Sequence, residues 1–164
     1  MKSKWTLTVV VAGLVALTVF AAGALATDPS GFTAIQQWKG VFGEMDVHVV
    51  DMPDWQVKLK TKGVSDVYVT RNSIDPGGQS GWHTHPGPSL ITVTVGEITA
   101  YDGDDPTCTP KRYRAGEGFV DPGDGHVHLL RNETAAPAET VAVQFLPQGA
   151  DRRKSTPAPG NCSF

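Results

Sequence analysis

Hydrophobic and polar residues alternate along much of the chain after about residue 41. Large apolar residues occupy every second position at Ile91, Val93 and Val95, and the same pattern returns over residues 141–145. A repeat of two places alternate side chains on opposite faces of a strand. No stretch after residue 26 keeps the 3.6-residue repeat of an amphipathic helix. The pattern therefore predicts an all-β chain.

Short segments rich in β-branched residues are separated by turns that carry many of the glycines and prolines. The expected strands are residues 45–50, 56–60, 64–71, 89–101, 118–121, 126–132 and 139–146. Seven or more short strands at this spacing predict a β-sandwich or a β-barrel. Residues 36–39 fit either a short helix or an extended arm.

The N-terminus has the features of an export signal. Lys2 and Lys4 precede an apolar run over residues 5–22, and Ala24 and Ala26 match the small-x-small pattern of a cleavage site. We expect a secretory signal peptide over residues 1–26, and hence a secreted or extracytoplasmic protein. The alternative is an uncleaved signal anchor, because the run approaches the roughly 20 residues of a membrane-spanning helix. The protein would then be anchored on the outer face of the membrane.

Length and charge limit the remaining organisation. A chain of 164 residues is long enough for one core and short for two domains. We expect an N-terminal arm with the first strands over 27–63, a barrel core over 64–147, and a C-terminal tail over 148–164. The net charge is −3. Because no dense cluster of lysine and arginine is present, we expect no nucleic-acid binding.

The chain has two cysteines, and both follow the export signal. Cys108 lies in a loop rich in proline and aspartate, and Cys162 lies near the C-terminus. In an oxidising compartment a disulfide between them is expected, and it would tie the tail to the body of the protein. The alternative is a pair of free thiols. Their wide spacing does not suggest a structural zinc site.

Four of the five histidines form two His-x-His pairs. His83 and His85 make the first pair, and His126 and His128 make the second. In an extended backbone residues i and i+2 point to the same side, so each pair can turn both rings toward one point. Imidazole is a common ligand for transition metals, so the two pairs predict a shared metal site. The fifth histidine, His48, stands alone and is expected to be structural.

The glycines, prolines and histidines around these pairs resemble the two sequence motifs of the cupin superfamily. The first motif, G-(x)5-H-x-H-(x)3,4-E-(x)6-G, is matched at Gly77, His83, His85 and Gly96. The second, G-(x)5-P-x-G-(x)2-H-(x)3-N, is matched with one additional residue at Gly116, Pro122, Gly125, His128 and Asn132. The resemblance covers about residues 64–145. It implies a single cupin-type β-barrel, also called a jelly roll or double-stranded β-helix.

The sequence departs from the cupin pattern at two positions. The glutamate of the first motif falls on Ser89, so the resemblance implies a 3-His site of His83, His85 and His128 without the carboxylate ligand. An ion held there would keep its full charge and attract an anionic ligand. The second departure is His126, two residues before the matched His128. His126 is a candidate catalytic acid or base, a fourth ligand, or a hydrogen-bond partner of a ligand.

The resemblance implies a divalent transition metal, which is iron, zinc, manganese, copper or nickel. The first functional hypothesis is a metalloenzyme of oxygenase, isomerase or lyase type that acts on a small molecule. The second is a non-catalytic barrel that binds a metal or a small ligand. A third is a barrel that serves assembly and retains the histidines without their function. The fold alone does not choose among them. By resemblance only, a homodimer is also expected.

Overall fold

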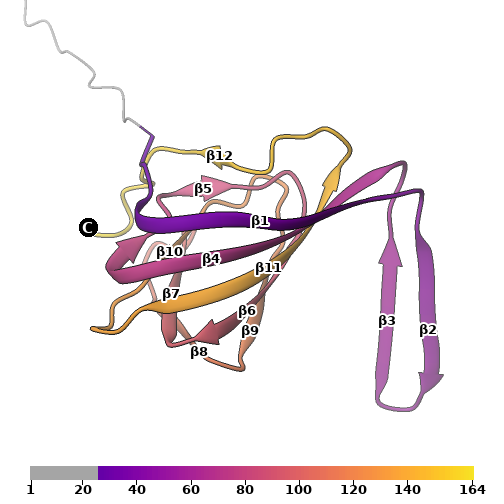
Figure 1. The fold of residues 1–164 in the computed structure, drawn as a ribbon, viewed down its shortest axis with the longest axis horizontal. Coiled ribbons are helices and arrows are strands. Elements are labelled where there is room, and N and C mark those ends of the chain that lie inside the picture. Colours follow the sequence, from indigo (N-terminus) through magenta and orange to yellow (C-terminus); the bar gives the residue numbers. More distant parts are fainter. Residues whose placement is uncertain (1–25) are drawn as a thin grey trace, which may run out of the picture.

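The computed structural model describes residues 26–164, and all of its regular structure is β (Figure 1). The predicted signal peptide lies almost wholly outside the described residues. The strands are β1 (Ser30–Phe42), β2 (Asp46–Met52), β3 (Trp55–Lys60), β4 (Ser65–Gln79), β5 (His83–Thr84), β6 (Ser89–Val95), β7 (Glu97–Asp102), β8 (Lys111–Arg114), β9 (Gly118–Asp121), β10 (His128–Arg131), β11 (Ala138–Pro147) and β12 (Lys154–Ser155). The all-β prediction is confirmed.

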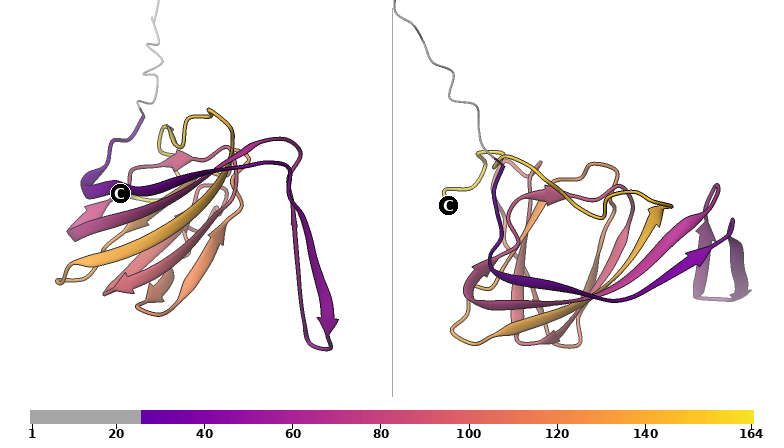
Figure 2. Two further views of the ribbon diagram at one scale, coloured as in Figure 1. Left: turned by 45° about the vertical axis from the view of Figure 1, so that its right-hand side comes forward. Right: turned by 45° about the horizontal axis from the view of Figure 1, so that its top comes forward.

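Ten of the strands form one sheet that curls into a nearly closed barrel (Figure 2). On one side β1, β4, β11, β6 and β9 are neighbours in that order, and on the other side β8, β7, β10, β5 and β12 are neighbours. The two sides join where Arg131 of β10 pairs with Gln79 of β4. All pairings are antiparallel. This arrangement places β5 and β10, which carry histidines, side by side.

Several strands begin or end elsewhere than the sequence suggests. Residues 36–39 belong to β1, so the extended alternative is the correct one. The expected strand over 89–101 is two strands, β6 and β7, because the chain turns at Gly96. Gly96 has a positive φ of 71°, and a Cβ there would lie 2.7 Å from the carbonyl oxygen of Pro137. The second histidine pair also differs, since β10 starts only at His128.

The β2–β3 hairpin lies outside the barrel and projects away from it, joined through β1 and β4 (Figures 1 and 2). Its side chains Val47, Trp55 and Val57 are exposed, as is Trp38 on β1. His48 lies on this hairpin and is exposed. The hairpin therefore contributes nothing to the barrel interior.

The expected homodimer stays a prediction.

Two groups of buried apolar residues hold the barrel together. The larger includes Ile74, Val93, Ile98 and Leu130, and a smaller one joins Trp82, Tyr101 and Leu129. Burial of such side chains contributes about 1.5–3 kcal/mol each. In residues 26–164 we find no helix with the length and apolar character needed to span a membrane.

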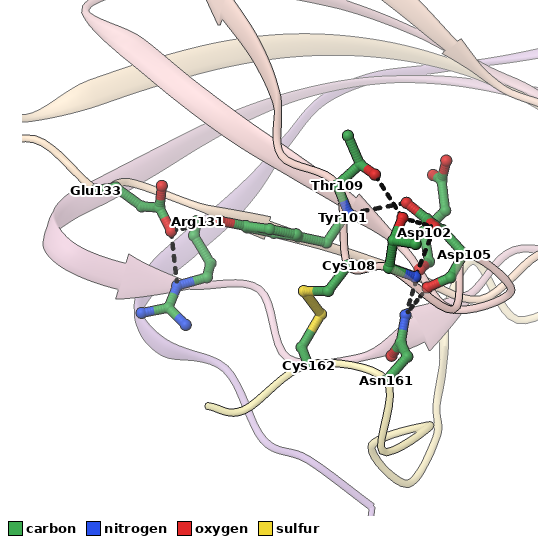
Figure 3. The surroundings of a disulfide bond; sticks show 10 residues. Tyr101, Asp102, Asp105, Cys108, Thr109, Arg131, Glu133, Asn161 and Cys162 are labelled. Carbon is green, nitrogen blue, oxygen red and sulfur yellow. Dashed lines mark hydrogen bonds and ion pairs between the residues drawn. A yellow bond between two sulfur atoms is a disulfide. The ribbon is translucent and has the colours of Figure 1, made fainter.

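The last residues return to the barrel and are attached to it near both of their ends. Cys108 and Cys162 form a disulfide bond, with their Cα atoms 5.2 Å apart (Figure 3). Beside it, the Asn161 side-chain amide donates to the carbonyl oxygens of Asp102 and Asp105 at 2.9 and 2.6 Å. At the other end, the N–H of Gly149 donates to Asp66 at 2.9 Å. Between these anchors β12 pairs with β5. Residues 148–164 thus lie along the edge that carries the first histidine pair.

Candidate metal centre

Three of the four paired histidines meet inside the barrel. His83 on β5 pairs directly with His128 on β10, and His85 immediately follows β5. The ring centroids lie 4.3 Å apart for His83 and His128, 4.8 Å for His83 and His85, and 5.3 Å for His85 and His128. One nitrogen of each ring lies within 4.8 Å of one nitrogen of each other ring. The three residues form a group that could hold a metal ion.

In each of the three rings the Nδ1 atom faces an oxygen. Nδ1 of His83 lies 2.8 Å from the carbonyl oxygen of Gly81, and Nδ1 of His85 lies 2.5 Å from that of Arg152. Nδ1 of His128 lies 3.3 Å from Oδ1 of Asp121, although that contact is not aligned as a hydrogen bond. An oxygen acceptor favours a proton on Nδ1, which leaves a lone pair on Nε2. Nδ1 of His85 also lies 3.2 Å from Nε2 of Gln144, but the carbonyl oxygen of Arg152 is nearer, so the contacts favour Nε2 as the donor atom of each ring.

Burial favours the neutral form of His83 and His85. His83, His85 and His128 are each at most 9% exposed. Burial lowers the pKa of His83 well below its usual value, and the neighbouring His128 and His85 lower it further. Burial also lowers the pKa of His85. Because a histidine must be neutral to bind a metal, low pKa values favour ligation at neutral pH.

A small cavity of about 60 Å³ opens beside the three rings. Its apolar lining includes Phe32, Ile91 and Leu130, and its polar lining comprises Thr70, Asn72, Ser89, Gln144, Arg152 and Arg153 in addition to the histidines. Gln144 connects several of these groups. Its Nε2 donates to Ser89 at 3.3 Å, and its Oε1 accepts from Nε of Arg152 at 3.1 Å.

Ser89, at the position of the cupin glutamate, is buried and lines this cavity. It pairs across the strands with Asp121 of β9. Asp121 lies behind His128 and is absent from the cavity lining. The carboxylate of Asp121 therefore contacts the His128 ring on the Nδ1 side of that ring.

His126 belongs to a different group from the other three histidines. It precedes β10, and its Nδ1 lies 3.0 Å from Oδ1 of Asp121. Its Nε2 lies 3.6 Å from Asp102. A second candidate group joins His126 to Asp121 and His128, and excludes His83 and His85. Burial alone would raise the pKa of Asp121. The contacts of Asp121 with His128 and His126 have the larger effect, so the pKa of Asp121 is lowered. Asp121 is thus an anion between the two histidines of the second pair.

Two features of the site could not be predicted from the sequence. Asp121 is one of several acidic residues whose side could not be assigned from alternation alone. Arg152 and Arg153 lie in a segment whose composition indicates only a tail. No local signal marks them, because their position depends on the return of residues 148–155 to β5. Trp82 and Tyr101 pack together in the smaller core group instead of lining the cavity.

One family model and several solved structures are similar to this chain. The family model described as Cupin domain matches residues 71–144. A structure of oxalate oxidase is 29% identical over 52% of this chain and 44% of that chain, with a TM-score of 0.45. An uncharacterized protein with a double-stranded β-helix domain from Klebsiella pneumoniae is 22% identical over 70% of this chain and 84% of its own, with a TM-score of 0.44.

A cupin superfamily protein from Desulfitobacterium hafniense is 12% identical over 69% of this chain and 82% of its own, with a TM-score of 0.44. No curated protein matches the chain significantly. The chain spans less than half the length of the oxalate oxidase that it matches. The matched residues contain both histidine pairs and both expected motifs. Residues 71–144 of the chain therefore match the cupin domain.

Proposed function

We propose that the protein binds a divalent transition metal through Nε2 of His83, His85 and His128, and that it acts as a metalloenzyme on a small molecule. The observation that carries this proposal is the orientation of the three rings. Each Nδ1 faces an oxygen of the protein, and the three rings meet at one cavity. Outer contacts of this kind fix the tautomer of metal-ligating histidines.

The donor set favours some of the expected metals over others. Three neutral imidazoles suit zinc, copper, iron and nickel, whereas manganese prefers carboxylate oxygens. Ser89 replaces the glutamate that would have supplied such an oxygen. Among the five expected ions, we infer that manganese binds least well.

The lining of the cavity supports an enzyme over a storage site. A site that only holds a metal has no need of further polar groups, but Asn72, Gln144, Arg152 and Arg153 also line this space. A few placed polar groups in an otherwise apolar pocket are typical of small-molecule sites. A bound divalent ion would supply Lewis-acid chemistry, or redox chemistry if it is iron or copper. The polar side chains would orient the substrate. The identity of the metal would determine whether the reaction is of oxygenase type or of isomerase or lyase type.

We also infer that the protein works outside the cytoplasm. The disulfide between Cys108 and Cys162 supports this, because such bonds persist mainly in oxidising compartments.

The first test is elemental analysis of the mature protein, produced without a histidine-rich tag and incubated in turn with each of the five ions. We expect one ion per chain in the wild type. His83→Ala, His85→Ala and His128→Ala should each lower metal affinity by more than about 100-fold, because even the loss of an outer contact costs about 10–100-fold.

His48→Ala is the matched control, since His48 is an exposed histidine on the β2–β3 hairpin. It should bind metal as the wild type does. Circular dichroism of each variant checks that the β-structure is retained. A wild type that binds none of the five ions, or a folded His128→Ala that binds them normally, would contradict the proposal.

A further inference from the structure

The two arginines at the cavity differ from the other arginines of the chain. Arg71, Arg112, Arg114 and Arg131 each have a glutamate carboxylate within 4.0 Å. Across the described residues, neither Arg152 nor Arg153 has a carboxylate within that distance, although both are partly buried. Partial burial of a cation without an anion is unfavourable. Among the described residues, the two guanidinium groups that line the cavity therefore lack an ion-pair partner.

Neutral groups hold both arginines in place. Arg152 donates to Gln144 and lies 5.2 Å from the centroid of the Tyr68 ring. Arg153 donates from Nη2 to the carbonyl oxygen of Ser80 and from Nη1 to Ser155, each at 2.6 Å. Its Nε is buried and has no partner among the described residues. Both side chains are thus ordered, and donor capacity remains unused.

The charge around the cavity is positive. Its lining contains the two arginines and no aspartate or glutamate. Burial lowers the pKa of Arg153, and Asp28 opposes this effect only from beyond ion-pair distance. A divalent ion on three neutral histidines would add two further positive charges. An anion entering this space would meet favourable charge on two sides.

We propose that Arg152 and Arg153 recognise the negative charge of the ligand, and that the ligand of the metal centre is a small carboxylate. This inference rests on the proposed function, because it assigns the substrate class of the same site. A cavity of about 60 Å³ admits only a few heavy atoms beside the rings. A guanidinium fork matches a carboxylate in shape and charge.

Acetate and its neutral analogue acetamide provide a direct test, since they are nearly identical in size. The protein is loaded with Co²⁺, and binding is followed by calorimetry and by the visible absorption of the ion. We expect acetate to bind at least tenfold more tightly than acetamide. Arg152→Gln and Arg153→Gln should each weaken acetate binding by about 10–100-fold, because each removes a charge-assisted hydrogen bond to the carboxylate. Acetamide binding and metal content should stay unchanged.

Arg112→Gln is the matched control, because Arg112 lies on β8, is 63% exposed and pairs with Glu97. It removes the same charge without touching the cavity, and it should leave acetate affinity unchanged. Arg152→Lys and Arg153→Lys keep the charge and should recover part of the affinity. Because the contact of His85 is with the main-chain oxygen of Arg152, these substitutions preserve it.

The outcomes separate this inference from the proposed function. Equal affinity for acetate and acetamide, or equal acetate affinity in Arg152→Gln, Arg153→Gln and Arg112→Gln, overturns the inference while metal binding stands. A wild type that binds no metal overturns the proposed function. In that case calorimetry with acetate on the metal-free protein tests the inference. Acetate binding that is lost in Arg152→Gln and in Arg153→Gln supports the inference, and a wild type that does not bind acetate overturns it.

Discussion

The cavity has two walls of different origin. The barrel forms one wall and supplies the three histidines, from β5, the residue after it and β10. Residues 148–155 of the tail form the other wall and carry the two arginines. Most of the barrel is held by continuous ladders, such as the ten residue pairs between β11 and β4, although β5 pairs with β10 at only one position. The tail wall has only the two-residue pairing of β12 with β5 and a few anchors at its ends.

This difference suggests that one wall binds the metal and the other recognises the ligand. Regions with few buried contacts open at lower free energy than core strands. His128 lies on β10, which pairs with β7 over four residues, so its position depends little on the tail, whereas recognition of the ligand depends on the tail being in place. The separation is incomplete, because Nδ1 of His85 contacts the main-chain oxygen of Arg152 and His83 pairs with Ser155 of β12. Changes to each wall should therefore have different effects on metal and on acetate.

The largest expected effect comes from removing the disulfide, which attaches only the tail wall. The bond closes a loop with a sequence separation of 54. In the chain-entropy model, the Cys108→Ser/Cys162→Ser variant should lose about 4 kcal/mol of unfolding free energy. Urea denaturation followed by circular dichroism measures this loss.

Treating the double variant with dithiothreitol is the control, and it should cause no further loss. Metal content of the folded variant should match the wild type, while acetate affinity falls. A loss below about 1 kcal/mol, or a loss of metal before the barrel unfolds, would contradict the separation of the two walls.

The two walls also differ in how far the sequence predicts them. The two histidine pairs could be identified because each pair is local and a strand of period two places its side chains together. The choice of His83, His85 and His128 among the four rests on the resemblance to the cupin motifs. The short alternating strands predict a β-sandwich or a β-barrel, and the resemblance to the two cupin motifs implies the jelly-roll architecture. The assignment of His126 needed the structure, because β10 starts only after it and its ring turns to Asp121.

Contacts distant in the sequence could not be predicted in the same way. The register that places Asp121 opposite Ser89 depends on the pairing of β6 with β9. The position of Arg152 depends on the return of the tail to a strand almost seventy residues earlier. The local composition of the two segments does not indicate that Asp121 lies opposite Ser89 or that Arg152 contacts His85.

An intermediate effect is expected from Asp121→Asn, which changes only the barrel wall. The carboxylate contacts Nδ1 of both His128 and His126. Removing its charge should weaken the preferred tautomer of His128 and lower metal affinity by about 10–100-fold. Competition with a chelator of known affinity measures this change.

Asp124→Asn is the matched control, since Asp124 is exposed on the turn before β10. It should leave metal affinity unchanged. His126→Ala should cost less than Asp121→Asn, because His126 touches the metal ligands only through Asp121 and stacking against His128. An unchanged affinity in Asp121→Asn would mean that the carboxylate plays no part in holding His128.

The smallest expected effect concerns the first anchor of the tail and depends on pH. Asp66 is fully buried and accepts from the N–H of Gly149, and it pairs with Lys39 of β1 at 2.8 Å. The hydrogen bond from Gly149 and then the pairing with Lys39 lower the pKa of Asp66. A pKa below the unfolded value of about 3.9 stabilises the fold above that pH, and this contribution is lost as the pH falls through the folded value.

The wild type should therefore exceed Asp66→Asn in stability at pH 7, and the difference should shrink below about pH 4. Urea midpoints of both proteins across this range measure the effect. Asp46→Asn is the control, because Asp46 forms an exposed pair with Lys60 on the hairpin, and such pairs contribute little. In Asp66→Asn at pH 7, acetate affinity should fall while metal content does not change, because Gly149 begins the wall that carries the arginines. A constant difference at all pH values would mean that the charge of Asp66 does not hold the tail, and that the anchor acts through packing alone.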